Sequence, residues 1–174
     1  DSNITIRERE KGATVKLFIG ISKGRSAYKG TDIMWEAARD ICRKYPDKIS
    51  LHVVEGLPYH EYVEAMKDSD IILDQLYSYT PAMNSLQAMS MGIISMGGGE
   101  EEGYEILGEK ELRPIINVEP AYDSVYAALE HFVLHPEEID KLRRQSIEYI
   151  RKHHDYLHVA KLYEAFYNRI IMNK

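Results

Sequence analysis

Short apolar runs alternate with longer amphipathic segments along this chain, and that alternation limits the folds it can adopt. The apolar runs lie at 15–21, 49–54, 71–73, 93–96 and 114–118. Helical spacing of apolar residues, or helix start and stop residues, mark segments at 31–44, 58–67, 82–91 and 100–107. Strands that alternate with helices form βαβ units around a parallel sheet. We therefore expect an α/β fold, an open, doubly wound parallel sheet of about five strands with helices on both faces.

The chain from residue 121 onward has a helical pattern throughout. Pro136 interrupts it, and so does the segment His153-His154-Asp155, so we expect two or three C-terminal helices. These histidines have no partner ligands near them in sequence. Asp68-Ser69-Asp70 has the form of a D-x-D metal site, but it lies where a helix meets a strand, at the amino edge of the sheet. We expect no metal site, and no spacing supports a Ser-His-Asp or Cys-His catalytic set.

Charge and cysteine content exclude several classes of protein. The 174 residues carry 22 Lys and Arg against 28 Asp and Glu, and no basic run is present, so we expect no nucleic-acid partner. Cys42 is the single cysteine, which excludes an internal disulfide and indicates a reducing, cytoplasmic location. No apolar run approaches the ~20 residues of a transmembrane segment, and the first residues lack a signal peptide. Because the first residue is Asp1 rather than Met, we expect a piece of a longer chain.

Ligands of doubly wound sheets bind outside the carboxyl ends of the strands, so the loops after the strands hold the candidate residues. The loop after the first strand, residues 22–30, carries Lys23, Arg25 and Lys29 between glycines. Cations in this place can neutralise phosphate, and glycines let the backbone approach a ligand; a solvated polar loop is the alternative, and composition favours neither. No G-x-G-x-x-G or Walker A pattern is present, which excludes the simplest dinucleotide and NTPase sites.

The helix at 82–91 offers a second candidate site. Free N–H groups and the dipole at a helix N-terminus favour a phosphate. Asn84 and Ser85 also suit an ordinary N-cap, and the local sequence favours that role. The methionines and leucine of this helix, including Met83 and Met89, are expected in the core. The acidic residues at 100–102 are expected in the first turn of the next helix, where the dipole favours negative charge.

Three blocks of the chain, in order, resemble one enzyme family. Gly24-Arg25 followed by Lys29-Gly30-Thr31-Asp32 resembles the G-R…K-G-x-D segment of GT-B-fold glycosyltransferases. Residues 59–74 resemble the approach to the family's next strand, and residues 85–95 resemble the L-E-A-M-A-x-G-x-P-V-V block of the group 1, family-4-like members. The resemblance implies that residues 1–174 form one Rossmann-like domain, the C-terminal, donor-binding domain of such an enzyme.

The resemblance also implies site residues. Lys29 matches the lysine that binds the donor pyrophosphate, with Arg25 as its looser-matched partner, and both are the expected catalytic groups. The family's two glutamates, eight residues apart, fall at Tyr79 and Gln87. The Gln87 amide can still hold ribose hydroxyls, whereas Tyr79 cannot copy a carboxylate that contacts the transferred sugar.

Further binding positions follow from the same resemblance. The backbone N–H groups of Met83, Asn84 and Ser85 are expected to hold the distal phosphate of the donor. Leu57, with the two residues after it, is expected to lie near the nucleotide base. Lys29, Arg25 and the helix end at Asn84 would together meet the charge of the leaving diphosphate.

The implied function is metal-independent glycosyl transfer with no cofactor, from a UDP-, GDP- or ADP-sugar to a glycan or lipid-linked acceptor. In the family an N-terminal domain of the same chain binds the acceptor, and a terminal helix crosses back to it. The expected helix at about 156–172 carries an apolar stripe that suits this role, although packing on its own sheet is equally compatible. We expect the isolated chain to bind donor weakly and transfer little sugar, and the full-length protein to be peripheral at the inner membrane.

Two other classes stay open. Loss of both family glutamates is compatible with a non-catalytic domain that binds sugar nucleotides or partners. Asp74, at the end of the third apolar run, occupies the place of the phospho-acceptor in receiver modules. Receivers also need an acidic pair after the first strand and a lysine after the fifth, and neither is present here.

Overall fold

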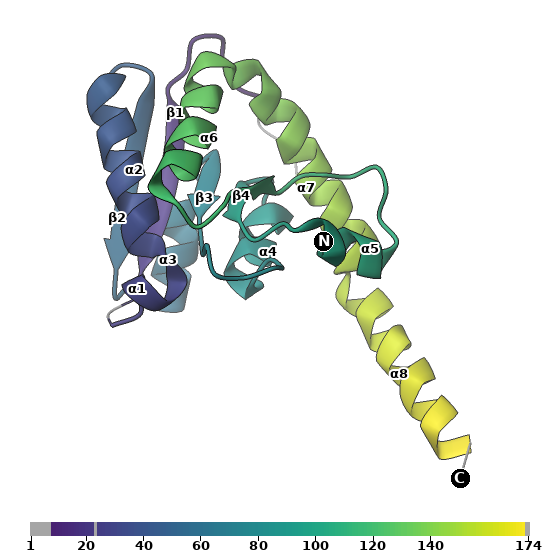
Figure 1. The fold of residues 1–174 in the computed structure, drawn as a ribbon. Helices are drawn as coiled ribbons and strands as arrows, with labels where there is room; N and C mark the ends of the chain where they lie inside the picture. Colours follow the sequence, from purple (N-terminus) through teal and green to yellow (C-terminus); the bar gives the residue numbers. More distant parts are fainter. Residues whose placement is uncertain (1–7, 23, 173–174) are drawn as a thin grey trace.

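The sheet has the predicted architecture. The structure is a computed structural model that describes residues 8–22 and 24–172. Its five strands are all parallel and follow the order β2-β1-β3-β4-β5, the first four of which are labelled in Figure 1. They are β1 Val15–Ile21, β2 Ile49–Glu55, β3 Ile71–Leu73, β4 Ile94–Gly97 and β5 Ile116–Asn117. The last strand is shorter than its apolar run at 114–118, because only Ile116 and Asn117 pair with β4.

Helices follow the strands where the sequence pattern predicts them, with one addition. The short helix α1 after β1 is new, and it ends at Gly30, whose φ of 72° is left-handed. A left-handed residue is a common helix terminus, and glycine adopts it without strain. The helices are α1 Ser26–Lys29, α2 Thr31–Lys44, α3 Tyr59–Met66, α4 Met83–Ser90, α5 Glu101–Leu107, α6 Tyr122–Leu134, α7 Ile139–His153 and α8 Tyr156–Met172, with a 3-10 turn at Pro136–Glu138.

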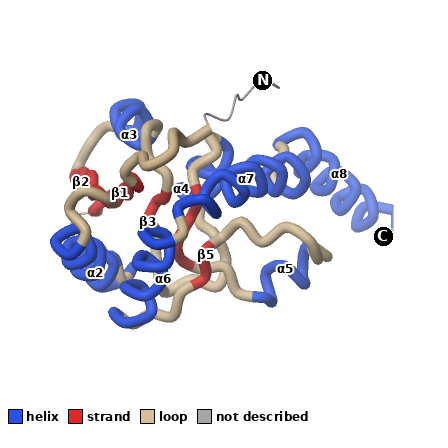
Figure 2. The backbone as a smooth tube through the Cα atoms, turned by 90° about the horizontal axis from the view of Figure 1, so that it is seen from above, coloured by secondary structure: helices blue, strands red, loops and turns tan. Residues whose placement is uncertain are grey.

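The helices cover both faces of the sheet, as a doubly wound fold requires. Leu17 and Ile19 of β1 face α2 and α6, whereas Phe18 between them faces α3 and α4 on the other side. Side chains of a strand alternate between faces, so one strand supplies both cores. In Figure 2 the strands lie between these two groups of helices, with α7 running beside α4. All carboxyl ends of the strands therefore lie along one edge.

Glu109 joins the loop after α5 to the end of α7. Its side chain is fully enclosed, and its carboxylate accepts hydrogen bonds from His153 at 2.6 Å and Lys152 at 2.7 Å. The backbone N–H groups of Glu111 and Leu112 donate to its other oxygen. These donors, His153 foremost, hold the pKa of the Glu109 carboxyl well below its usual range. The predicted break at His153 is confirmed, and this ion-pair cluster stabilises the end of α7.

The stabilising effect of Glu109 is expected to disappear in acid. A carboxyl whose pKa is lower when folded stabilises the protein above its unfolded pKa, and the effect is lost as the pH falls. Glu109→Gln should therefore be less stable than the wild type at about pH 7, with the difference shrinking below about pH 4. Urea unfolding followed by circular dichroism across this pH range measures both free energies of unfolding. An unchanged difference from neutral to acid pH would contradict the role of the ionised carboxylate.

The terminal helix α8 stands away from the body of the molecule (Figure 1). None of its residues is buried, and Leu162, Phe166 and Ile170 of its apolar stripe are 57%, 47% and 45% exposed. The alternative that this helix packs on its own sheet is therefore wrong. Within residues 8–22 and 24–172, no helix combines the length and hydropathy needed to cross a bilayer.

Candidate ligand-binding site

A cavity of about 580 Å³ opens at the carboxyl edge of the sheet, beside the ends of β1 and β2. Its walls come from α1, the loop after β2, α3 and the first turns of α4. Five residues predicted from the sequence line it, namely Lys29, Leu57, Met83, Asn84 and Gln87. Tyr59, which was expected near the nucleotide base, lines it as well, and so do Gly20 and Tyr62, which were not predicted as site residues. The fold thus gathers residues from four separate segments around one space.

Asp74 links the cationic loop to the beginning of α4. It directly follows β3 and is only 3% exposed. Lys29 Nζ lies 3.7 Å from Asp74 Oδ1, and Asn84 Nδ2 donates to the same oxygen at 3.2 Å. Because one carboxylate binds both groups, the lysine and the beginning of α4 lie side by side. This convergence is what a diphosphate site at this edge requires.

The expectation that Asn84 or Ser85 caps the helix is wrong. The N-cap of α4 is Ala82, and no side chain bonds there. Asn84 and Ser85 lie inside the first turn and donate to Asp74 instead, Ser85 Oγ at 2.7 Å. Ser85 is 2% exposed and is not among the residues that line the cavity, so its hydroxyl is enclosed in the protein. The first backbone hydrogen bond of α4 runs from the Leu86 N–H to the Ala82 carbonyl. The N–H groups of the residues before Leu86 have no partner within the helix, as at any helix N-terminus.

Met83 is exposed, not buried in the core as its helical pattern indicated. Its side chain is the first of α4 and lies at the mouth of the cavity, 80% exposed. The first residue of a helix can extend past the sheet that the later turns contact. Met89, two turns further along, is fully buried as predicted.

The side-chain amide oxygen of Gln87 already accepts a hydrogen bond within the protein. Tyr59 donates its hydroxyl hydrogen to Gln87 Oε1 at 3.1 Å. The amide nitrogen, which carries two hydrogens, is the remaining polar group of this side chain. Gln87 can therefore act toward a ligand as a donor, for example to the oxygen of a ribose hydroxyl.

Tyr62 forms the inner wall of the cavity. Its ring stands edge-on to Phe18 at 5.2 Å between centroids, and its hydroxyl oxygen accepts a hydrogen bond from Asn84 Nδ2 at 3.0 Å. Burial raises the pKa of Tyr62 to about 12. Gly20 at the end of β1 leaves the space for this ring, since a Cβ there would lie 2.4 Å from the Tyr62 hydroxyl.

Gly20→Ala is expected to move Tyr62 and to destabilise the domain by about 1–3 kcal/mol. The added methyl group would overlap the hydroxyl oxygen and two ring atoms of Tyr62, and this ring is packed against Phe18, so it cannot simply turn away. Urea unfolding measures the change, with Gly56→Ala as a comparison for a glycine whose Cβ meets nothing within 4 Å but whose φ is positive. A Gly20→Ala domain as stable as the wild type would contradict the close packing of Tyr62.

Comparisons with known proteins identify the family. The model of the family described as glycosyl transferase-like matches residues 21–165, most of the chain. The chain belongs to this family. Comparison with curated proteins found no match.

Several solved structures share the fold. The C-terminal domain of a group 1 glycosyl transferase from Francisella tularensis is 15% identical, with a TM-score of 0.59, over 82% of this chain and 87% of that chain. Sucrose-phosphate synthase from Thermosynechococcus elongatus is 12% identical, with a TM-score of 0.64, over 92% of this chain and 46% of that one. The catalytic domain of a cholesterol-α-glucosyltransferase from Helicobacter pylori is 11% identical, with a TM-score of 0.52, over 78% of this chain and 96% of that chain. The resemblance to group 1 GT-B glycosyltransferases is confirmed, and the chain spans less than half the length of the synthase.

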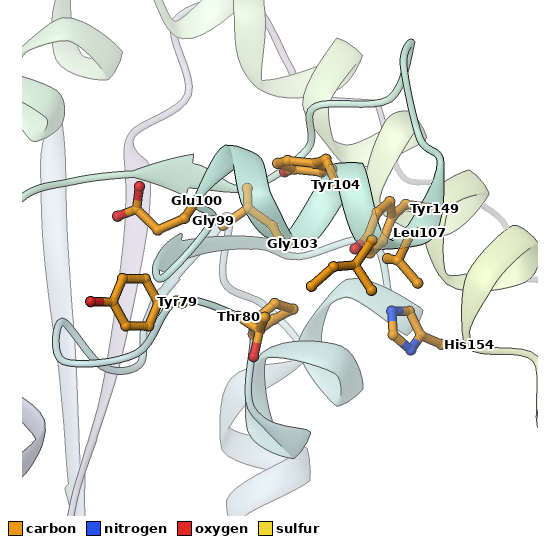
Figure 3. Close-up of a pocket in the computed structure, with 12 residues that line it drawn as sticks. Tyr79, Thr80, Gly99, Glu100, Gly103, Tyr104, Leu107, Tyr149 and His154 are labelled. Atoms are coloured by element: carbon orange, nitrogen blue, oxygen red, sulfur yellow. The ribbon is translucent and has the colours of Figure 1, made fainter.

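Two positions implied by the glycosyltransferase resemblance lie away from this cavity. Arg25 precedes α1, is exposed, and is not among the residues that line the cavity. Tyr79 lines a second cavity of about 250 Å³ with Thr80, Glu100 and residues of α5 and α7 (Figure 3). The Glu100 N–H donates to the Tyr79 carbonyl at 3.2 Å, which ties this loop to the beginning of α5. Their roles stay predictions.

Asp74 does not suit the phospho-acceptor role, and Asp70 does not suit a metal site. Both oxygens of Asp74 accept hydrogen bonds inside the protein, whereas a phospho-acceptor carboxylate must reach a phosphoryl donor. Asp70 lies at the opposite edge and pairs with Arg9 and with Arg143 at 3.5 Å. Among the residues that the structure describes, no group of three His, Cys, Asp or Glu side chains could hold a metal ion.

Proposed function

We propose that this domain binds a nucleoside-diphosphate sugar in the 580 Å³ cavity and stabilises the leaving diphosphate during glycosyl transfer. The observation that carries the proposal is the meeting of Lys29 and the beginning of α4 on Asp74. Glycosyl transfer builds negative charge on the departing diphosphate, and fixed cations and N–H donors stabilise that charge as it develops. Lys29 and the first turn of α4 can meet this charge without a metal ion, so we propose metal-independent transfer.

The cavity residues that were predicted from the sequence have separate roles in the proposed complex. The Lys29 side chain, 25% exposed, reaches the phosphates, and the first N–H groups of α4 bind the distal one. The Gln87 amide nitrogen donates to the ribose. Leu57 offers an apolar surface to the base. Arg25 and Tyr79 would act only after the loops that hold them move toward the ligand.

The exposed stripe of α8 supports a two-domain enzyme. We propose that an N-terminal, acceptor-binding domain of the full-length chain covers this helix, because apolar side chains left in water favour a partner surface. The acceptor would be a glycan or a lipid-linked glycan. The isolated domain, without that partner, is expected to bind donor weakly and transfer little or no sugar.

A cytoplasmic location is part of the same proposal. Cys42 is a free, partly buried thiol, which suits a reducing compartment. If the acceptor is lipid-linked, the full-length protein would work at the inner face of the membrane as a peripheral enzyme.

Titration with UDP, GDP and ADP and their sugars, followed by ligand-observed NMR, tests the proposal. We expect one nucleoside diphosphate to bind the wild type and to bind Lys29→Ala much more weakly. Absence of binding by all three would overturn the proposed function.

A non-catalytic role in binding sugar nucleotides is the second candidate function. It is favoured by the presence of Tyr79 and Gln87 in place of the two glutamates. Full-length protein that binds donor but transfers no sugar to any glycan acceptor would establish it.

A further inference from the structure

The hydroxyl of Tyr62 is a polar group whose hydrogen has no acceptor in the described chain. The residue lies in the second turn of α3 and lines the cavity between Gly20 and Asn84. Its oxygen accepts from Asn84 Nδ2 at 3.0 Å. Within residues 8–22 and 24–172 it donates to no acceptor. A phenol carries one donor hydrogen, so this hydrogen is available to a ligand.

The direction of the hydrogen bond between Asn84 and Tyr62 follows from Asp74. An ionised carboxylate only accepts, so the Asn84 group that faces Asp74 must be the amide nitrogen. The same nitrogen faces the Tyr62 oxygen and donates its second hydrogen there. An amide nitrogen accepts no hydrogen bond, so the Tyr62 hydrogen must point elsewhere. Tyr59 differs in this respect, because its hydrogen is donated to Gln87 Oε1.

Further contacts hold Tyr62 and Asn84 in place. Ser85 donates to Asp74 Oδ2 at 2.7 Å, and Ser95 Oγ donates to Ser85 Oγ at 2.8 Å. These buried hydrogen bonds hold the Asp74 carboxylate in place, and the carboxylate in turn holds the Asn84 amide. The ring of Tyr62 is held against Phe18. Since burial raises the pKa of Tyr62 to about 12, its hydroxyl keeps the hydrogen at neutral pH.

We propose that Tyr62 donates its hydroxyl hydrogen to a phosphate oxygen of the nucleoside diphosphate, which makes it a binding residue of the site. The inference rests on the proposed function. Phosphate is the favoured acceptor because Tyr62 and Lys29 are joined through Asn84 and Asp74, so both side chains border the same part of the cavity. The carboxylate of Asp74 also repels an anion nearby, and a neutral donor beside the lysine offsets part of that repulsion. A hydrogen bond from a neutral hydroxyl to an ionised oxygen is among the stronger kinds.

Tyr62→Phe tests the proposal, since it removes one oxygen and keeps the ring. The titration uses whichever of UDP, GDP and ADP binds the wild type, by isothermal calorimetry, together with ³¹P NMR of the bound diphosphate. We expect about tenfold weaker binding and a changed ³¹P shift of the bound phosphate. Tyr126→Phe, a tyrosine of α6 on the other face of the sheet, is the matched control and should change neither.

The outcomes separate this inference from the proposed function. If the wild type binds a diphosphate and Tyr62→Phe binds it equally well, the inference is overturned and the proposed function stands. If binding weakens but the ³¹P shift stays unchanged, the hydroxyl acts only through the fold, which also overturns the inference. If no nucleoside diphosphate binds the wild type, the proposed function and the inference fail together.

Discussion

Lys29→Ala is expected to weaken binding of a nucleoside diphosphate by about thirtyfold. The substitution removes the cation that lines the cavity, and it leaves the carboxylate of Asp74 without a positive neighbour beside the incoming anion. Both changes act against a charged ligand. Calorimetric titration at low and moderate salt measures the loss, and the wild type should lose affinity with added salt more steeply than the variant because it forms one more ionic contact.

Lys67→Ala is the matched control for Lys29→Ala. Lys67 is a lysine of similar chemistry that pairs with Glu64 on the surface and lies at the opposite edge of the sheet. Its removal should leave affinity for the diphosphate unchanged. Equal affinities of the wild type, Lys29→Ala and Lys67→Ala would place the diphosphate away from this cavity.

Asp74→Ala is expected to lower the free energy of unfolding by about 3–5 kcal/mol. The enclosed hydroxyl of Ser85 and the amide of Asn84 would lose their acceptor, and Lys29 would lose its counter-ion. Buried polar groups left without partners destabilise a protein more than the original bonds stabilised it. Asp74→Asn should recover part of the loss, since its amide oxygen still accepts one hydrogen bond.

Urea unfolding compares these variants with Asp68→Ala. Asp68 is an exposed aspartate at the amino edge, and its removal is expected to change stability by less than about 0.5 kcal/mol. A loss of under about 1 kcal/mol in Asp74→Ala would mean that water replaces the missing carboxylate. In that case Asp74 would not organise the site.

The sheet and its helices were predictable because their signal is local. Helix α2 begins and ends where the apolar spacing over 31–44 indicates, and β3 spans 71–73 as predicted. Helix α1 was missed because its four residues include none that is buried, so no apolar periodicity marks it. The sequence of residues 22–30 could indicate charge and glycine there, but not a single helical turn closed by Gly30.

The site was only partly predictable because its contacts join distant segments. Asn84 and Ser85 suit a cap by their residue type, but a carboxylate ten and eleven residues earlier in the chain binds them instead. Tyr62 is one of 13 tyrosines, and only the folded chain distinguishes it by its contact with Gly20 and Asn84. Tyr79 was assigned from its position relative to Gln87, yet the bond from Glu100 carries its loop toward α5.

The exposed helix α8 should be visible in hydrogen exchange. Its 17 residues rise about 25 Å, and an isolated helix of this length is marginal in water. Its amide hydrogens should therefore exchange with deuterium faster than those of α2 or α7, which have buried sides. Slower exchange along α8, in the presence of another protein segment, would report directly when that helix becomes covered.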